Sequence, residues 1–176
     1  MDLTNYIKKI IVAALVLVTV AMQAQPVDYC NDPKFEDKVS SVLSFSVPVV
    51  SVTDLDNMDD DVYILDAREP EEYDVSHIPG AQYIGYDKPD WSVLDDIPSD
   101  GKIVLYCSVG YRSEKLGEKV QEKGFSNVYN LYGSIFEWAN EGLPLVDKNG
   151  ENTKAVHTWN KRWSQWVTHP SVEKVW

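Results

Sequence analysis

The 176-residue sequence is poor in cysteine and in basic residues, and both shortages limit what the protein does. Its two cysteines are too few for a disulfide framework or a four-cysteine zinc site. Lys and Arg number 16 against 28 Asp and Glu, so the formal net charge is −12. This balance argues against nucleic acid or an anionic membrane as the main partner, because both attract clustered positive charge. Internal repeats and low-complexity stretches are also missing, and 44% hydrophobic residues indicate a folded globular chain.

The N-terminus carries a basic segment and then an apolar run from Ile10 to Met22. A secretory signal peptide typically has a basic segment, an apolar core of about 7–15 residues and a small residue at the cleavage site. A transmembrane helix needs about 20 apolar residues, so an uncleaved anchor or a buried helix is the less favoured alternative. We therefore expect residues 1–24 to be removed after Ala24, or else after Ala21. The mature protein is then periplasmic or secreted, with no stable membrane anchor.

The sequence after the signal divides into three segments. Residues 25–45 form an unstructured leader and an amphipathic helix over Phe35–Phe45, residues 46–146 form the main domain, and residues 147–176 form an extension. In the main domain, five short runs rich in Val, Ile and Tyr alternate with helical or turn segments. This order predicts an α/β fold, in which a mostly parallel five-stranded sheet has helices on both faces. The runs are Val47–Val52, Val62–Leu65, Gln82–Tyr86, Lys102–Cys107 and Asn127–Leu131.

The C-terminal extension begins with a hairpin-turn signal, Lys148-Asn149-Gly150-Glu151. Further on, Trp159, Trp163 and Trp166 are spaced i, i+4 and i+7, which predicts one apolar stripe on a short helix. We expect this tryptophan stripe to pack against the domain, because apolar helical stripes usually face a core. A docking surface for a protein partner is the alternative.

The sequence does not indicate a metal site. Counting a calcium loop from Asp54 puts Met58 at a ligand position and Leu65 at the position of the bidentate glutamate. His157 and His169 have no ligand spacing to the cysteines. The acidic run near residue 54 is therefore interpreted as a solvated turn.

Cys107 is the candidate for chemistry, because it ends the apolar strand at Lys102–Cys107. In an open α/β sheet, ligands bind beyond the carboxyl ends of the strands. Backbone amides of the following loop and the start of a helix over Ser113–Lys123 favour a thiolate, and Arg112 adds a positive charge. The thiolate is the nucleophilic form. Two alternatives stay open: a buried structural cysteine, and a disulfide with Cys30 of the leader, which we expect to be mobile.

Three ordered segments resemble those of single-domain rhodaneses, which are sulfurtransferases. The segment ILDAREPEEY (64–73) followed by HIPGA (77–81) looks like the family's first signature, and CSVGYRS (107–113) looks like its active loop. Tyr132 is a departure, since the family often has a second glycine there, and it leaves the cysteine loop unaffected. The resemblance covers roughly residues 46–146. The closing segment of the family is matched by Gly133, Trp138, Gly142 and Pro144.

The resemblance implies group transfer through a persulfide, without a cofactor. Cys107 would attack the outer sulfur of a donor such as thiosulfate, release sulfite and pass the sulfur to cyanide or a small thiol. Arg112 would bind the oxyanion end of the donor, while loop amides hold the anionic sulfur. The residues expected to bind the substrate are Ser108, Val109, Gly110, Tyr111 and Arg112.

Three further residues of the first signature have expected roles. Asp66 and Arg68 end a strand two residues apart, so they face the same side and can form an ion pair. In the family that the chain resembles, such residues brace the active loop. His77 precedes Ile-Pro-Gly, which is turn chemistry, so we expect it to be structural rather than a catalytic base.

Two other functions stay open at this point. Cys-based phosphatases and arsenate reductases have five residues between Cys and Arg, whereas four separate Cys107 from Arg112, and Tyr106 stands where phosphatases commonly have His. The shorter loop favours a sulfur atom over a tetrahedral oxyanion. The second alternative is a module that binds sulfane sulfur or a partner with little catalysis. An accessible and acidic Cys107 thiol distinguishes the enzyme from that module.

Overall fold

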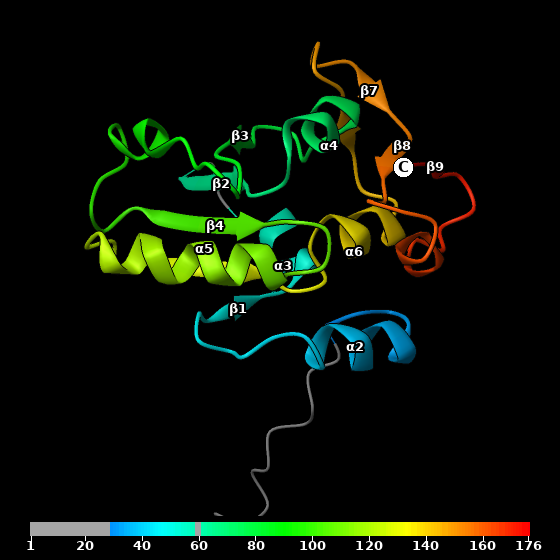
Figure 1. Ribbon diagram of the computed structural model, residues 1–176, viewed down its shortest axis with the longest axis horizontal. Helices are drawn as coiled ribbons and strands as arrows, with labels where there is room; N and C mark the ends of the chain where they lie inside the picture. Colours follow the sequence, from blue (N-terminus) through cyan, green and yellow to red (C-terminus); the bar gives the residue numbers. More distant parts are fainter. Residues whose placement is uncertain (1–28, 59–60) are drawn as a thin grey trace, which may run out of the picture.

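The computed structural model describes residues 29–58 and 61–176, and a parallel sheet of five strands forms its centre (Figure 1). The predicted signal peptide lies outside the described residues. Within the described part, no helix is both long and apolar enough to cross a membrane. The strand order is β1-β5-β4-β2-β3, and every neighbouring pair is parallel, so the predicted α/β fold is confirmed. The strands are β1 (Val49–Val50), β2 (Val62–Asp66), β3 (Gln82–Tyr83), β4 (Lys102–Tyr106) and β5 (Val128–Leu131).

Both faces of the sheet are covered, as the continuous apolar runs predict. Along β4, Ile103 and Leu105 belong to one hydrophobic cluster, while Val104 and Tyr106 belong to the other. This alternation follows from the two-residue period of a strand, and a central parallel strand is apolar on both sides for that reason. The sheet therefore fixes β4 firmly, and with it the position of the residue that follows.

One face carries α5 (Tyr111–Glu122), which runs along β4 and packs there through Leu116 and Val120 (Figure 1). The helices α3 (Val52–Asp56) and α6 (Ser134–Asn140) pack in the cluster on the other face together with α2 (Pro33–Ser40). The short elements α4 (Pro70–Val75) and η1 (Trp91–Leu94) lie in the connections before β3 and β4.

The first described helix is shorter than expected. We predicted it over Phe35–Phe45, whereas α2 begins at Pro33 and ends at Ser40. It begins early because the Asp32 side chain accepts the amide of Lys34 and proline suits the first turn. Beyond it, Phe45 has a left-handed backbone with φ +55°, which a continuous helix does not contain.

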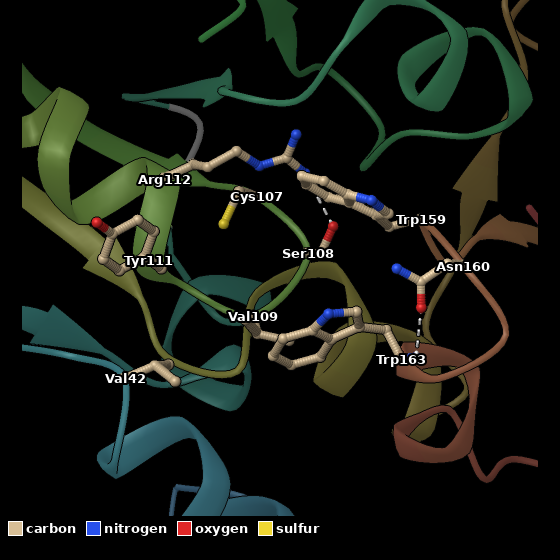
Figure 2. A pocket seen from close by; sticks show the side chains of 9 residues that line it. All are labelled: Val42, Cys107, Ser108, Val109, Tyr111, Arg112, Trp159, Asn160 and Trp163. Carbon is tan, nitrogen blue, oxygen red and sulfur yellow. Dashed lines mark hydrogen bonds between the residues drawn. The ribbon is translucent and has the colours of Figure 1, made fainter.

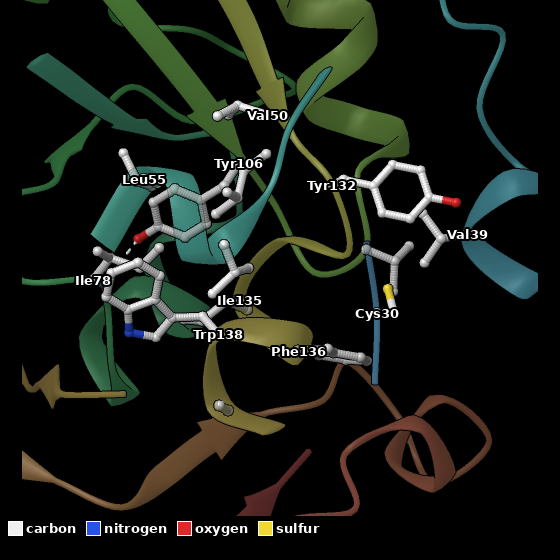
Figure 3. Close-up of a cluster of buried hydrophobic side chains, with 14 of the residues drawn as sticks. Cys30, Val39, Val50, Leu55, Ile78, Tyr106, Tyr132, Ile135, Phe136 and Trp138 are labelled. Atoms are coloured by element: carbon white, nitrogen blue, oxygen red, sulfur yellow. Dashed lines mark hydrogen bonds between the residues drawn. The ribbon is translucent and has the colours of Figure 1, made fainter. Parts of the chain in front are cut away.

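The leader was expected to be mobile up to Asp32, and this is wrong for Cys30. Its amide and that of Tyr29 donate to the Glu36 carboxylate at 2.8 and 3.1 Å, and the side chain is buried in the core. Figure 3 shows Cys30 among Val39, Tyr132 and Phe136. Both cysteines are free thiols, so the alternative of a disulfide between Cys30 and Cys107 is not realised.

The C-terminal extension begins within the expected hairpin, in which β6 (Leu145–Val146), at the end of the main domain, pairs antiparallel with β7 (Asn152–Thr153). It continues as β8 (Ala155–His157), a 3₁₀ turn η2 (Trp163–Trp166) and β9 (Glu173–Val175), which pairs parallel with β8.

The predicted helical stripe of three tryptophans is wrong. The Asn160 side chain accepts the amides of Arg162 and Trp163, so the helical turn begins after residue 160 and Trp159 falls outside it. The end of the stripe does pack on the domain, because Trp166 stacks on Phe35 with ring centroids 5.8 Å apart.

Candidate active site

Cys107 follows β4 directly, at the carboxyl end of the central strand, and four residues later its loop has entered α5. The position is the one that the sequence predicts. The sulfur faces a cavity of about 470 Å³ (Figure 2). The side chains around this cavity come from the segment after α2, from the cysteine loop with the start of α5, and from the C-terminal extension. The lining residues are Val42, Cys107, Ser108, Val109, Tyr111, Arg112, Trp159, Asn160 and Trp163.

The loop curls because of Gly110, which stands at the N-cap of α5 with φ +119°. Only glycine adopts this backbone without strain, and it turns the Gly110 amide back to donate to the Cys107 sulfur at 3.2 Å. The Asn130 side chain, from β5, donates to the Gly110 carbonyl oxygen at 3.0 Å and lies 2.7 Å from the Ser113 hydroxyl. The loop is therefore held by the sheet as well as by its own helix.

The surroundings of Cys107 favour the thiolate. Burial raises the pKa of the Cys107 thiol, but the positive charge of Arg112 and hydrogen bonds from Ser113 and Gly110 outweigh it, so the pKa is lowered overall. The residue is only 1% exposed, and it lines the cavity. A lowered thiol pKa at a cavity is typical of a reactive cysteine, whereas a purely structural cysteine is inert.

Arg112 is held more tightly than a free anion-binding residue would be. Its two terminal nitrogens bind the two carboxylate oxygens of Glu72 at 2.7 and 2.8 Å, and one of them also reaches the Ser108 hydroxyl at 3.0 Å. Its guanidinium lies 5.1 Å from the centre of the Trp159 ring. An oxyanion that binds Arg112 therefore competes with the Glu72 carboxylate. The sequence analysis, which expected Arg112 to bind the donor, did not predict this competitor.

Asp66 and Arg68 form the expected ion pair, at 2.6 Å and fully buried. Arg68 also donates to the Ser76 carbonyl oxygen at 2.6 Å and lies over the Tyr106 ring. Among the hydrogen bonds of the described residues, none joins this pair to residues 108–112. The pair fixes the strand end beneath the loop, and the direct braces of the loop come from elsewhere.

His77 occupies a structural position, in agreement with its expected role. Its ring stacks on Tyr73 with centroids 3.8 Å apart, and its Nδ1 lies 3.1 Å from the Tyr73 carbonyl oxygen. Its backbone pairs with Val146 of the hairpin.

Three residues that the sequence analysis did not single out hold the loop: Glu72, Asn130 and Ser134. Glu72 lies in the first turn of α4, where it completes a capping box with Glu69 besides binding Arg112. Ser134 accepts the Cys107 amide at 3.1 Å. Asn130 had a usable signal, since a polar residue in the otherwise apolar interior strand β5 needs a buried partner.

No group of three or more His, Cys, Asp or Glu side chains suited to a metal ion occurs in the part of the chain that the structure describes.

A family model and several known proteins match this chain. The family model described as "Rhodanese-like domain" matches residues 51–141. A protein named "Sulfurtransferase" from Allochromatium vinosum is 34% identical over 94 residues, covering 52% of this chain and 84% of that protein. The probable adenylyltransferase/sulfurtransferase MoeZ of Mycobacterium tuberculosis is 38% identical over 82 residues, covering 46% of this chain and 21% of MoeZ. The chain thus spans about a fifth of the length of MoeZ.

The fold has counterparts among solved structures. The crystal structure of the BH2092 protein from Bacillus halodurans has a TM-score of 0.57 at 21% identity, covering 76% of this chain and 98% of that chain. The likeness shows a shared fold.

Proposed function

Because the chain belongs to the rhodanese-like domain family, we propose that it is a sulfurtransferase that carries sulfane sulfur on Cys107. The observation that supports this most is the Gly110 amide directed at the Cys107 sulfur, at 3.2 Å, in a loop that lowers the thiol pKa. A sulfur anion fits this environment, since an amide donor and a nearby guanidinium both stabilise negative charge.

The proposed reaction has two displacements at sulfur. The Cys107 thiolate attacks the outer sulfur of thiosulfate, a new S–S bond forms, and the S–S bond of the donor breaks. Sulfite leaves with the electron pair of the broken bond. Cyanide or a thiolate then attacks the outer sulfur of the persulfide, and the electron pair returns to Cys107 as thiolate. Because each step exchanges one bond for another, no oxidant, reductant or cofactor takes part.

Each part of the loop has a place in this scheme. The Gly110 amide holds the anionic sulfur, first of the thiolate and then of the persulfide. Arg112 stabilises negative charge from a fixed position, since Glu72 keeps its guanidinium in place from 2.7 and 2.8 Å. The closed loop has four residues between Cys107 and Arg112, and we propose that it selects a sulfur atom over the larger oxyanion of a phosphatase substrate.

The test is the formation of thiocyanate from thiosulfate and cyanide by the reduced protein. We expect turnover by the wild type, and loss of turnover by at least about a hundredfold in Cys107→Ser, because the hydroxyl cannot carry the sulfur. Cys30→Ala is the matched control, since Cys30 is buried outside the cavity. Turnover that survives in Cys107→Ser contradicts the proposal. A folded, reduced wild type that takes up sulfur from neither thiosulfate nor polysulfide is instead a binding module.

A further inference from the structure

The cavity beside Cys107 is larger and more apolar than small anions such as thiosulfate and cyanide require. Its volume of about 470 Å³ lies in the range of sites for organic molecules, which is roughly 300–1,000 Å³. Of the nine described residues that line it, Arg112 is the only cation, and Glu72 pairs with both of its terminal nitrogens. A ligand with carboxylates of its own therefore finds no unpaired cation among these lining residues.

Aromatic rings form much of the wall. In Figure 2, Trp159 and Trp163 lie on one side of the Cys107 sulfur, and Tyr111 lies on the other. Flat aromatic walls bind apolar and aromatic groups through stacked or edge-to-face contacts. Both tryptophans come from the extension, so this wall is added to the domain that carries the loop.

Trp159 has an unfavourable backbone conformation, as residues at binding sites often do. Its backbone is left-handed, with φ +60°, and the residue is 55% exposed. Its amide donates to His157 Nδ1 at 3.2 Å, and the amide of Asn160 donates to the Thr158 carbonyl oxygen at 2.6 Å, which together fix the turn. A left-handed backbone at a tryptophan is unfavourable by itself, and such strain clusters at binding sites. Here it holds an indole over Arg112, at the wall of the cavity.

We propose that this cavity binds the apolar, aromatic body of a small organic thiol, which accepts the sulfur from Cys107. The inference rests on the proposed persulfide of Cys107 and names the class of its acceptor. The acceptor loses its thiol proton to solvent, and its thiolate forms a bond to the outer sulfur of the persulfide. The S–S bond to Cys107 breaks, its electron pair stays on Cys107, and the organic persulfide leaves.

The test begins with a loaded enzyme. The full chain is treated with thiosulfate or, if that donor fails, with polysulfide, and the persulfide on Cys107 is verified by intact mass. This step alone decides the proposed function, so its failure is separate from any failure of the acceptor proposal. The loaded protein is then discharged by phenylmethanethiol, 2-mercaptoethanol, glutathione or cyanide. At equal thiolate concentration, we expect phenylmethanethiol to react about tenfold faster than either other thiol.

Variants of Trp159 test whether the aromatic wall of the cavity binds the acceptor. Trp159→Ala should lower the ratio of the phenylmethanethiol rate to the cyanide rate about tenfold, which corresponds to about 1.4 kcal/mol. Trp159→Phe should restore most of the rate, because it keeps an aromatic face. Trp176→Ala is the matched control, since Trp176 is 59% exposed in the same extension and does not line the cavity. Equal slowing of every acceptor, or glutathione as the fastest thiol, would overturn the proposal.

A second measurement does not depend on the persulfide. Phenylmethanol is an unreactive analogue of the aromatic acceptor, and its binding is followed through the indole N–H signals of ¹⁵N-labelled protein. We expect the signals of Trp159 and Trp163 to shift on titration and that of Trp176 to stay. Absence of a shift at Trp159 and Trp163 contradicts the proposal even if the protein never accepts sulfur.

Discussion

Replacing Glu72 with glutamine tests whether the carboxylate holds the loop through Arg112. The side chains of Glu72 and Arg112 are 4% and 9% exposed, and two contacts of 2.7 and 2.8 Å join them. Removing one partner of a buried ion pair leaves the other charge unpaired, which destabilises a protein by about 3–5 kcal/mol. Glutamine keeps one acceptor oxygen, so we expect the lower end, about 3 kcal/mol.

The assay is thermal unfolding followed by circular dichroism. For a domain of this size, each kcal/mol lowers the unfolding midpoint by about 2–4 °C, so Glu72→Gln should unfold roughly 6–12 °C below the wild type. Glu71→Gln is the matched control, because Glu71 is the neighbouring carboxylate in α4 and is exposed. A surface change of this kind should stay within about 2 °C of the wild type.

The same variant has a defined pH dependence. Burial raises the pKa of Glu72, but its hydrogen bonds with Arg112 and the charge of that residue outweigh this, so the folded-state pKa is lowered. The unfolded chain therefore binds the proton more readily, and the carboxylate contributes its full stabilisation above the unfolded pKa of about 4.3. That contribution is lost as pH falls through the folded pKa. The difference between wild type and Glu72→Gln should thus shrink below about pH 4. A midpoint within about 2 °C of the wild type at neutral pH, or a difference that persists unchanged in acid, refutes the reasoning.

Two more outcomes follow from the structure, and a third follows from the sequence. Gly110→Ala should destabilise the protein by about 1–3 kcal/mol and slow alkylation of Cys107, because φ is +119° there and the new Cβ would lie 3.2 Å from a Leu43 methyl carbon; unchanged unfolding and alkylation contradict this. Iodoacetamide at neutral pH should modify Cys107 well before Cys30, because burial and the charges of Glu137 and Glu36 raise the pKa of Cys30; peptide mapping that finds equal rates opposes the account. We propose that the exported protein begins at residue 25, and N-terminal sequencing that finds residue 1 argues against a cleaved signal.

The sheet and the cysteine loop were predictable because their signals are local. The run at Lys102–Cys107 is apolar at every position between its ends, which predicts a strand buried on both faces. A glycine-containing loop and a helix follow this strand, and that order places Cys107 at the carboxyl end of the sheet. The ion pair of Asp66 and Arg68 was also predicted, although the strand argument extended too far, since β2 ends at Asp66 and Arg68 lies two residues beyond it.

The rest of the site depends on contacts between distant segments, which a local pattern does not contain. Glu72 satisfies the pattern of a helix start so well that its pairing with Arg112 is hidden. Cys30 lies in a segment with few apolar residues, yet the adjacent amide of Asn31 donates to Glu137, more than a hundred residues away. The helical spacing of the tryptophans wrongly placed Trp159 in a helix. The Asn160 side chain accepts the amides of Arg162 and Trp163, so the helical turn begins only after residue 160.

The intact mass of the reduced protein after a single exposure to thiosulfate, and again after cyanide, tests the central proposal most directly. We predict a gain of one sulfur atom that maps to Cys107, that cyanide removes, and that Cys107→Ser lacks while Cys30→Ala retains it. A gain that maps to Cys30, or one that survives in Cys107→Ser, contradicts the account.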